Sequence, residues 1–131
     1  MRKKSFQELT KLVLKTPYFR CNPDAPAEIH SITSHAYLFM YIAAIKSFLR
    51  FYNDIAIALH DDGSLENKDK TLLERHVRGI RIIEKNFADK KMTRVLRNFP
   101  NSKNYRATDL IAMQLFDYTF FSQTEKFISL D

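Results

Sequence analysis

The stretch Ile55-Ala56-Ile57-Ala58-Leu59-His60-Asp61-Asp62-Gly63-Ser64-Leu65 joins an apolar run to a run of polar and turn-forming residues. A short, unbroken apolar run is typical of a β-strand that is buried on both faces, as in a parallel sheet. Asp, Gly and Ser are common in turns and at helix starts, so the strand is expected to end near His60. Residues 55–59 are therefore predicted to form a buried strand, and residues 60–65 the loop that follows it.

Strand and helix patterns alternate on both sides of this stretch. The expected strands are residues 28–33, 55–59, 80–83 and 124–131. The expected helices after them are residues 37–52, 67–77, 87–98 and 107–118. The nearly all-round apolarity of residues 37–52 predicts a largely buried helix, and the last strand is expected to be buried as well. The sequence thus predicts an α/β fold with a mainly parallel, open sheet of about four strands and flanking helices.

The 131 residues are enough for one domain. Residues 1–26 are expected to form an N-terminal helix, over 5–16, and an extended connector; residues 27–131 are expected to form the α/β domain. The single cysteine, Cys21, cannot form an internal disulfide, and the longest apolar stretch is too short for a membrane span. A cytoplasmic location is therefore expected.

The charge is positive overall and unevenly distributed. The chain has 21 Lys and Arg against 15 Asp and Glu, and the excess of bases lies mainly in residues 1–20 and 66–106. Two glycines in the whole chain exclude the glycine-rich phosphate loops. A basic helix such as the one expected near residues 87–98 usually has its charged face in solvent. Its apolar residues Phe87, Met92, Val95 and Leu96 would also suit a peripheral contact with anionic lipid.

Polar side chains follow three of the predicted strands. They are Thr33, Ser34 and His35, then His60, Asp61 and Asp62, and finally Asp131. Ligands of open parallel sheets bind outside the carboxyl ends of the strands. Carboxylates there would suit Mg²⁺ or Mn²⁺, or the hydrogen-bonding edge of a nucleobase. The plainer interpretation is a turn and a helix cap, and His30 and His60 are expected to be hydrogen-bonded histidines at strand ends rather than ligands.

Five parts of the sequence carry a family resemblance, namely the run Leu59–Leu65, residues 45–50, residues 79–83, Arg106 at a helix start and Phe127-Ile128-Ser129-Leu130-Asp131. Together they resemble the amino-terminal half of glycosyltransferases with the GT-A (nucleotide-diphospho-sugar transferase) fold. The likeness covers about residues 27–131 and implies a Rossmann-like, nucleotide-sugar-binding half of that fold. In the family, the last of these strands leads into an Asp-x-Asp motif that holds a metal ion and the diphosphate. The sequence stops at the first of those aspartates, so the resemblance implies a truncated chain that is inactive alone.

The resemblance also implies a role for each matching residue. Thr33, Ser34 and His35 would border the nucleoside pocket, and Asp61 or Asp62 would accept a hydrogen bond from the base. Arg106 would face the diphosphate, and Asp131 would be the first carboxylate of a site for Mn²⁺ or Mg²⁺. The implied partners are a nucleotide-diphosphate sugar and an acceptor hydroxyl, with no specific nucleic acid.

Two other functions fit the same residues. A non-enzymatic nucleotide- or polyanion-binding module could use the same sheet edge or the basic residues 66–106. A phospho-acceptor receiver domain also has paired aspartates after a strand, but it needs a further aspartate and a lysine on later strands. In every case the last strand is expected to leave an open sheet edge, through which the chain would self-associate.

Overall fold

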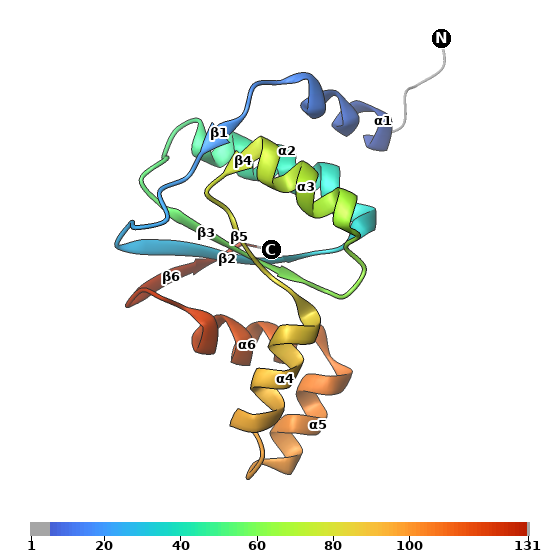
Figure 1. The fold of residues 1–131 in the computed structure, drawn as a ribbon, viewed down its shortest axis with the longest axis vertical. Helices are drawn as coiled ribbons and strands as arrows, with labels where there is room; N and C mark the ends of the chain where they lie inside the picture. The colour runs from blue at the N-terminus through green and yellow to red at the C-terminus, as the bar shows by residue number, and fades with distance from the viewer. Residues whose placement is uncertain (1–5, 131) are drawn as a thin grey trace.

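The computed structural model describes residues 6–130 as an α/β domain built on a parallel sheet (Figure 1). The main sheet consists of β2 (Ala27–Thr33), β3 (Ala56–Asp61), β5 (Arg81–Ile83) and β6 (Lys126–Ser129). Their order is β5-β3-β2-β6, and each neighbouring pair runs parallel. The predicted α/β class with an open, parallel, four-stranded sheet is confirmed.

Helices cover both faces of this sheet (Figure 1). The 3-10 turn η2 (His35–Tyr37), α2 (Leu38–Leu49) and α3 (Asn67–His76) connect β2, β3 and β5 over one face. On the other face lie α4 (Lys85–Val95), α5 (Pro100–Thr108) and α6 (Leu110–Phe121), of which α6 is nearest to the sheet. The chain therefore changes faces before β6 adds to the free side of β2. The boundary between β2 and β6 is the topological switch point of the sheet, where α/β proteins bind ligands.

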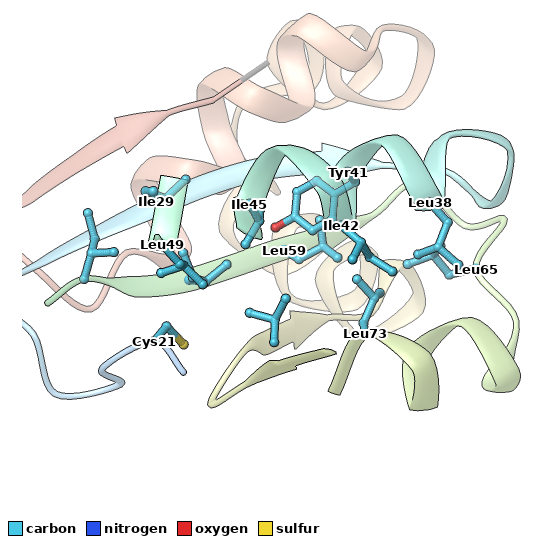
Figure 2. Packing of buried hydrophobic residues seen from close by; sticks show 13 residues of the cluster. Cys21, Ile29, Leu38, Tyr41, Ile42, Ile45, Leu49, Leu59, Leu65 and Leu73 are labelled. Carbon is cyan, nitrogen blue, oxygen red and sulfur yellow. The ribbon is translucent and has the colours of Figure 1, made fainter. Parts of the chain in front are cut away.

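The main core lies between the sheet and α2 and α3 (Figure 2). Successive side chains of a strand point to opposite faces, so Ile29 of β2 and Leu59 of β3 face this core while Ala58 packs on the other side with Ile83 and Ala88. All six residues of β3 are buried. The prediction that this apolar strand is covered on both faces is therefore confirmed.

The N-terminal segment is attached to the domain by a short second sheet. After α1 (Phe6–Thr10) and the 3-10 helix η1 (Lys11–Lys15), β1 (Phe19–Arg20) pairs in parallel with β4 (Val77–Arg78). Part of the expected connector over residues 18–26 is thus a strand. Two-residue strands carry no periodic pattern, and the partner of β1 lies far along the chain, so the sequence offers no signal for this pairing.

Lys46 joins the N-terminal segment to α2 and α3. Its ammonium group is buried and donates to Thr16 Oγ1 and to the carbonyl oxygen of Pro17, at 2.8 Å each. It also donates to His76 Nδ1 at 2.8 Å, so this ring nitrogen carries a lone pair. Burial lowers the pKa of Lys46 from its ordinary value. A cation on the inner face of α2 therefore binds acceptors from two separate parts of the chain.

The helices before β6 differ from the single one expected there. The helix expected over residues 107–118 is α6, which begins at Leu110 because the Asp109 carboxylate accepts a hydrogen bond from the Ile111 N–H and so caps it. A separate helix, α5, precedes it and starts with Pro100 in the first turn, where a missing N–H has no cost.

Two of the elements expected to be buried, the last strand and the helix α2, are more exposed than expected. Every residue of β6 is exposed, because this strand lies at the edge of the sheet and pairs only with β2 among the described strands. Met40 and Ala44 of α2 are exposed as well, although the opposite side of the helix lies in the core. The self-association expected of the open edge stays a prediction.

No helix within residues 6–130 has the length and apolarity needed to cross a membrane. The contact with lipid expected of the basic helix required Phe87, Met92, Val95 and Leu96 on one accessible face. In α4 and the turn after it, Met92 and Leu96 are buried, whereas Phe87 and Val95 are exposed. Half of that expected apolar face therefore packs inside the protein.

Replacing Ile42, which is 0 % exposed in the centre of the core, with Ala should lower the free energy of unfolding by about 2–5 kcal/mol. The substitution removes buried methyl groups and leaves a cavity between α2 and the sheet. Urea denaturation measures the change. The matched control is Phe51→Ala after α2, at a side chain that is 84 % exposed, which should change stability by no more than about 0.5 kcal/mol. Equal effects of the two substitutions would contradict the placement of this core.

Candidate functional site

A hollow of about 420 Å³ opens at the switch point of the sheet. Its polar lining comes from Thr33 and Ser34, at the carboxyl end of β2, and from Asp62, which follows β3. Leu130, whose N–H donates to the His30 carbonyl oxygen at 2.9 Å, closes the side next to β6. Three of the residues predicted from sequence thus surround one hollow, at the sheet edge where they were expected.

Apolar side chains that the sequence analysis did not select form most of the remaining wall. They are Ile32, Tyr37, Met40, Tyr41, Ala44 and Leu110, with Leu130. Most of them come from η2 and α2. The sequence signal that could have found this wall is the apolarity of α2 on more than one side. One side of the helix packs in the core, and Met40 and Ala44 face the hollow.

The aspartate loop is held in shape by its own side chains. Asp61 Oδ1 accepts hydrogen bonds from the N–H groups of Gly63, at 2.7 Å, and Leu65, at 3.2 Å. Asp62 Oδ1 accepts from the N–H and the hydroxyl of Ser64, at 2.9 and 2.6 Å. Gly63 supports this turn with a φ of +103°, which residues with a Cβ rarely adopt. The turn expected at this position is present, and only Asp62 of the pair also faces the hollow.

Ser34 and His35 occupy different surroundings although they are neighbours. Ser34 Oγ is buried at the hollow and has no hydrogen-bond partner among the described residues. A buried hydroxyl of this kind usually has a partner. His35 instead binds the aspartate loop and α3. Its backbone N–H donates to Ser64 Oγ at 2.9 Å, and its ring Nδ1 lies 2.7 Å from Asp69 Oδ2.

Arg106 does not line this hollow. Its guanidinium forms a two-pronged pair with the buried Asp117, at 2.7 Å for each hydrogen bond, and donates to Asp89 at 2.9 Å. It faces another hollow, of about 290 Å³, between α4 and α5 together with Lys85 and Lys103. The expectation that Arg106 faces a diphosphate stays a prediction, and in this structure two carboxylates hold it.

The described residues do not supply a donor set for Mn²⁺ or Mg²⁺. Within residues 6–130, no three His, Cys, Asp or Glu side chains converge on one point. The Asp61 carboxylate accepts from the loop and lies 3.6 Å from Lys70 Nζ, a cation that would compete with a metal ion. Asp131, the expected first carboxylate of the metal site, lies outside the described residues.

A second polar cluster lies inside the protein, on the α6 face of the sheet. Glu28 Oε1 lies 2.9 Å from His30 Nε2 and accepts the Gln123 N–H at 2.7 Å, while Oε2 accepts from Arg81 Nη2 at 3.1 Å. His30 Nδ1 lies 2.8 Å from His60 Nε2. Both histidines are fully buried. They are hydrogen-bonded, as expected, but His30 lies in the middle of β2 rather than at its end.

The charge on Glu28 sets the protonation of both rings. Burial opposes ionisation, but hydrogen bonds, that of His30 foremost, lower the pKa of Glu28 to about 2. His30 therefore donates from Nε2 to a carboxylate, and its unprotonated Nδ1 accepts from His60 Nε2–H. His60 Nδ1 is left as a buried acceptor with no hydrogen-bond partner among the described residues. These hydrogen-bonded side chains are enclosed in the core, which favours a structural role over a catalytic one.

Acid should destabilise the protein through these groups. Burial, with smaller effects of His30 and Arg81, lowers the pKa of His60 from 6.5 to about 3, so only the unfolded chain takes up this proton between those values. The free energy of unfolding should consequently fall as the pH drops from 6.5, by about 3 kcal/mol at pH 4 from His60 alone. Glu28, with its pKa lowered from 4.5 to about 2, should add to the loss below pH 4.5.

Urea denaturation from pH 7 to pH 4 measures this dependence, and His60→Gln should flatten it by removing the titrating ring. The control His35→Gln, at an exposed histidine, should keep the dependence. An NMR titration of the wild-type protein provides a readout without substitution, since the His60 ring protons should not shift above pH 4. Titration of His60 near pH 6.5 in the folded protein would contradict the buried neutral pair.

Comparison with known proteins gives no relative for the chain. No protein-family model matches it, and neither a curated protein nor a solved structure matches it. The likeness to nucleotide-sugar transferases therefore depends on the residues quoted from the sequence. What the structure adds is the open α/β sheet and the hollow bounded by Thr33, Ser34 and Asp62.

Proposed function

We propose that this chain binds a nucleotide-diphosphate sugar at the carboxyl edge of its sheet, as the donor-binding part of a glycosyltransferase. The main observation in support is the hollow at the switch point, where Thr33, Ser34 and Asp62 meet an apolar wall. Its volume of about 420 Å³ lies within the roughly 300–1,000 Å³ of small-molecule sites. A mostly apolar wall with a few convergent polar groups is the usual composition of such sites.

The polar groups of the hollow suit a nucleoside. The Asp62 carboxylate only accepts hydrogen bonds, so it would take the N–H of a base or a ribose hydroxyl. The buried Ser34 Oγ has no partner among residues 6–130, and its hydroxyl would donate to a base carbonyl once the side chain turns toward the hollow. Tyr37, 60 % exposed where it borders the hollow, offers an aromatic face for stacking. The proposed orientation therefore places the base in the hollow and the diphosphate and sugar toward solvent.

The diphosphate and metal parts of the proposal rest on residues other than those described as lining this hollow. Arg106 would have to exchange the carboxylate of Asp89 for a phosphate oxygen, while keeping Asp117. A role for Mn²⁺ or Mg²⁺ rests on Asp131 and on the family resemblance. Base and ribose recognition are consequently the parts to test first.

Isothermal titration of the 131-residue chain with uridine, guanosine and cytidine diphosphate sugars, with and without MnCl₂, tests the proposal. One of them should bind saturably, and Asp62→Asn should weaken that binding about tenfold or more, because a charged acceptor is lost. The amide NMR signals of Ser34, Met40 and Leu110 should shift with the same dissociation constant.

The matched control is Asp24→Asn, the same substitution at an exposed residue before β2, at the opposite end of the strands. It should leave the affinity unchanged. Absence of saturable binding for all three donors would refute the proposal. So would an Asp62→Asn variant that binds as tightly as the wild-type protein.

The alternative, a polyanion-binding module, is favoured by a different observation. Several exposed cations lie on α4, on the turn after it and on α5, namely Lys90, Lys91, Arg94, Arg97 and Lys103. A polynucleotide that bound there would lose affinity steeply with salt, because counterions are released on binding. Steep salt dependence combined with no preference for nucleotide sugars would replace the first proposal with this one.

A further inference from the structure

A second open hollow, of about 450 Å³, lies at the other end of the parallel strands. It is bordered by Arg81 at the start of β5 and by Ser122 and Gln123 just before β6, so it is at the amino edge of the sheet. Phe87 and Lys91 of α4 and the two phenylalanines at the end of α6 complete its sides. Nothing in the proposed nucleotide site uses these residues.

Three phenyl rings form a continuous apolar wall in this hollow. The ring centroids of Phe120 and Phe121 are 5.0 Å apart, and those of Phe87 and Phe121 are 6.0 Å apart. Phe87 is 52 % exposed and Phe120 is 44 % exposed. Clustered aromatic side chains that remain accessible to water are typical of interaction surfaces.

The charged groups beside the rings are positive. Lys91 Nζ lies 5.7 Å from the centroid of the Phe87 ring and makes no ion pair among the described residues. Arg81 donates from Nη2 to Glu28 and to the Phe121 carbonyl, which leaves its Nη1 and Nε without hydrogen-bond partners in the described chain. The residues described as lining the hollow include no carboxylate. The positive charge of the hollow therefore complements an anionic side chain of a ligand.

An unpaired strand edge lies next to the same rings. β5 is the end strand of the order β5-β3-β2-β6, so β3 is its one neighbour among the described strands. The backbone of an edge strand can pair with an extended segment of another chain, and adjacent pockets then select alternate side chains. Ile82 and Ile83 of β5 also line the hollow, so the strand edge and the aromatic wall are contiguous.

We propose that β5 and this hollow together form a docking surface for an extended, acidic peptide segment of a partner protein. The segment pairs its backbone with the outer edge of β5. An apolar side chain of the segment packs on Phe87 and Phe120, and an adjacent carboxylate binds Lys91 and the free nitrogens of Arg81. The surface lies away from the nucleotide hollow, so it does not depend on nucleotide binding.

Fluorescence polarisation of the full chain with a labelled peptide tests this surface. The probe alternates glutamate and valine around one central phenylalanine, and a second peptide replaces each glutamate with lysine. The acidic peptide should bind and the basic one should not. Lys91→Glu should weaken binding about tenfold, the order expected when one charge at a docking surface is reversed. Lys90→Glu is the control, since this exposed neighbour makes the same charge change outside the hollow and should have little effect.

A third peptide separates strand addition from simple charge attraction without altering the protein. It has the acidic sequence with alternate backbone nitrogens methylated, so it cannot donate hydrogen bonds to β5. Loss of its binding supports the proposal. Equal binding of the methylated and unmethylated peptides would overturn it, and so would failure of the acidic peptide to bind or equal losses in the Lys90→Glu and Lys91→Glu variants.

Discussion

The placement of β5 and β6 depends on the carboxylate of Glu28, which stays charged inside the protein. Glu28 is 1 % exposed, and its partners are His30 on its own strand, Arg81 on β5 and the backbone N–H of Gln123 after α6. A buried charge that loses a partner costs about 3–5 kcal/mol. The Glu28 carboxylate therefore fixes the start of β5 and the link from α6 to β6 beside the start of β2. That link fixes where β6 adds to β2, and with it the position of Leu130 at the far end of the sheet.

Residues 27–76 were predictable because each of their elements carries its own signal. The unbroken apolar run of β3 is stable only with both faces covered, which requires a sheet with helices on two sides. Turn-forming residues mark where that strand ends. Parallel pairing of β2 with β3 then brings Thr33 opposite Asp61, so two segments that are far apart in sequence had to meet at one edge. The placement of Thr33, Ser34 and Asp62 follows from these local patterns.

What the sequence could not provide are pairings between distant residues. A pattern tells which side of an element is apolar, not what packs against it. The sequence therefore predicts Met40 on a buried helix, whereas the residue lies in the wall of a hollow. The sequence likewise does not reveal the two carboxylate partners of Arg106, because they lie on two other helices. The link between Glu28 and Arg81 spans 53 residues. Such contacts depend on how helices pack over the sheet, which no single periodic segment determines.

The exposed edge strand β6 has a consequence for motion. Its four residues are exposed, and it pairs in the sheet with β2 alone among the described strands, so few interactions oppose its local opening. Because Leu130 directly follows β6 and borders the hollow at the switch point, opening of the strand also opens that hollow. A molecule held there selects the closed form by mass action. Slower amide hydrogen exchange along β6 would then report occupancy of the hollow, even for a ligand that never touches the strand's backbone.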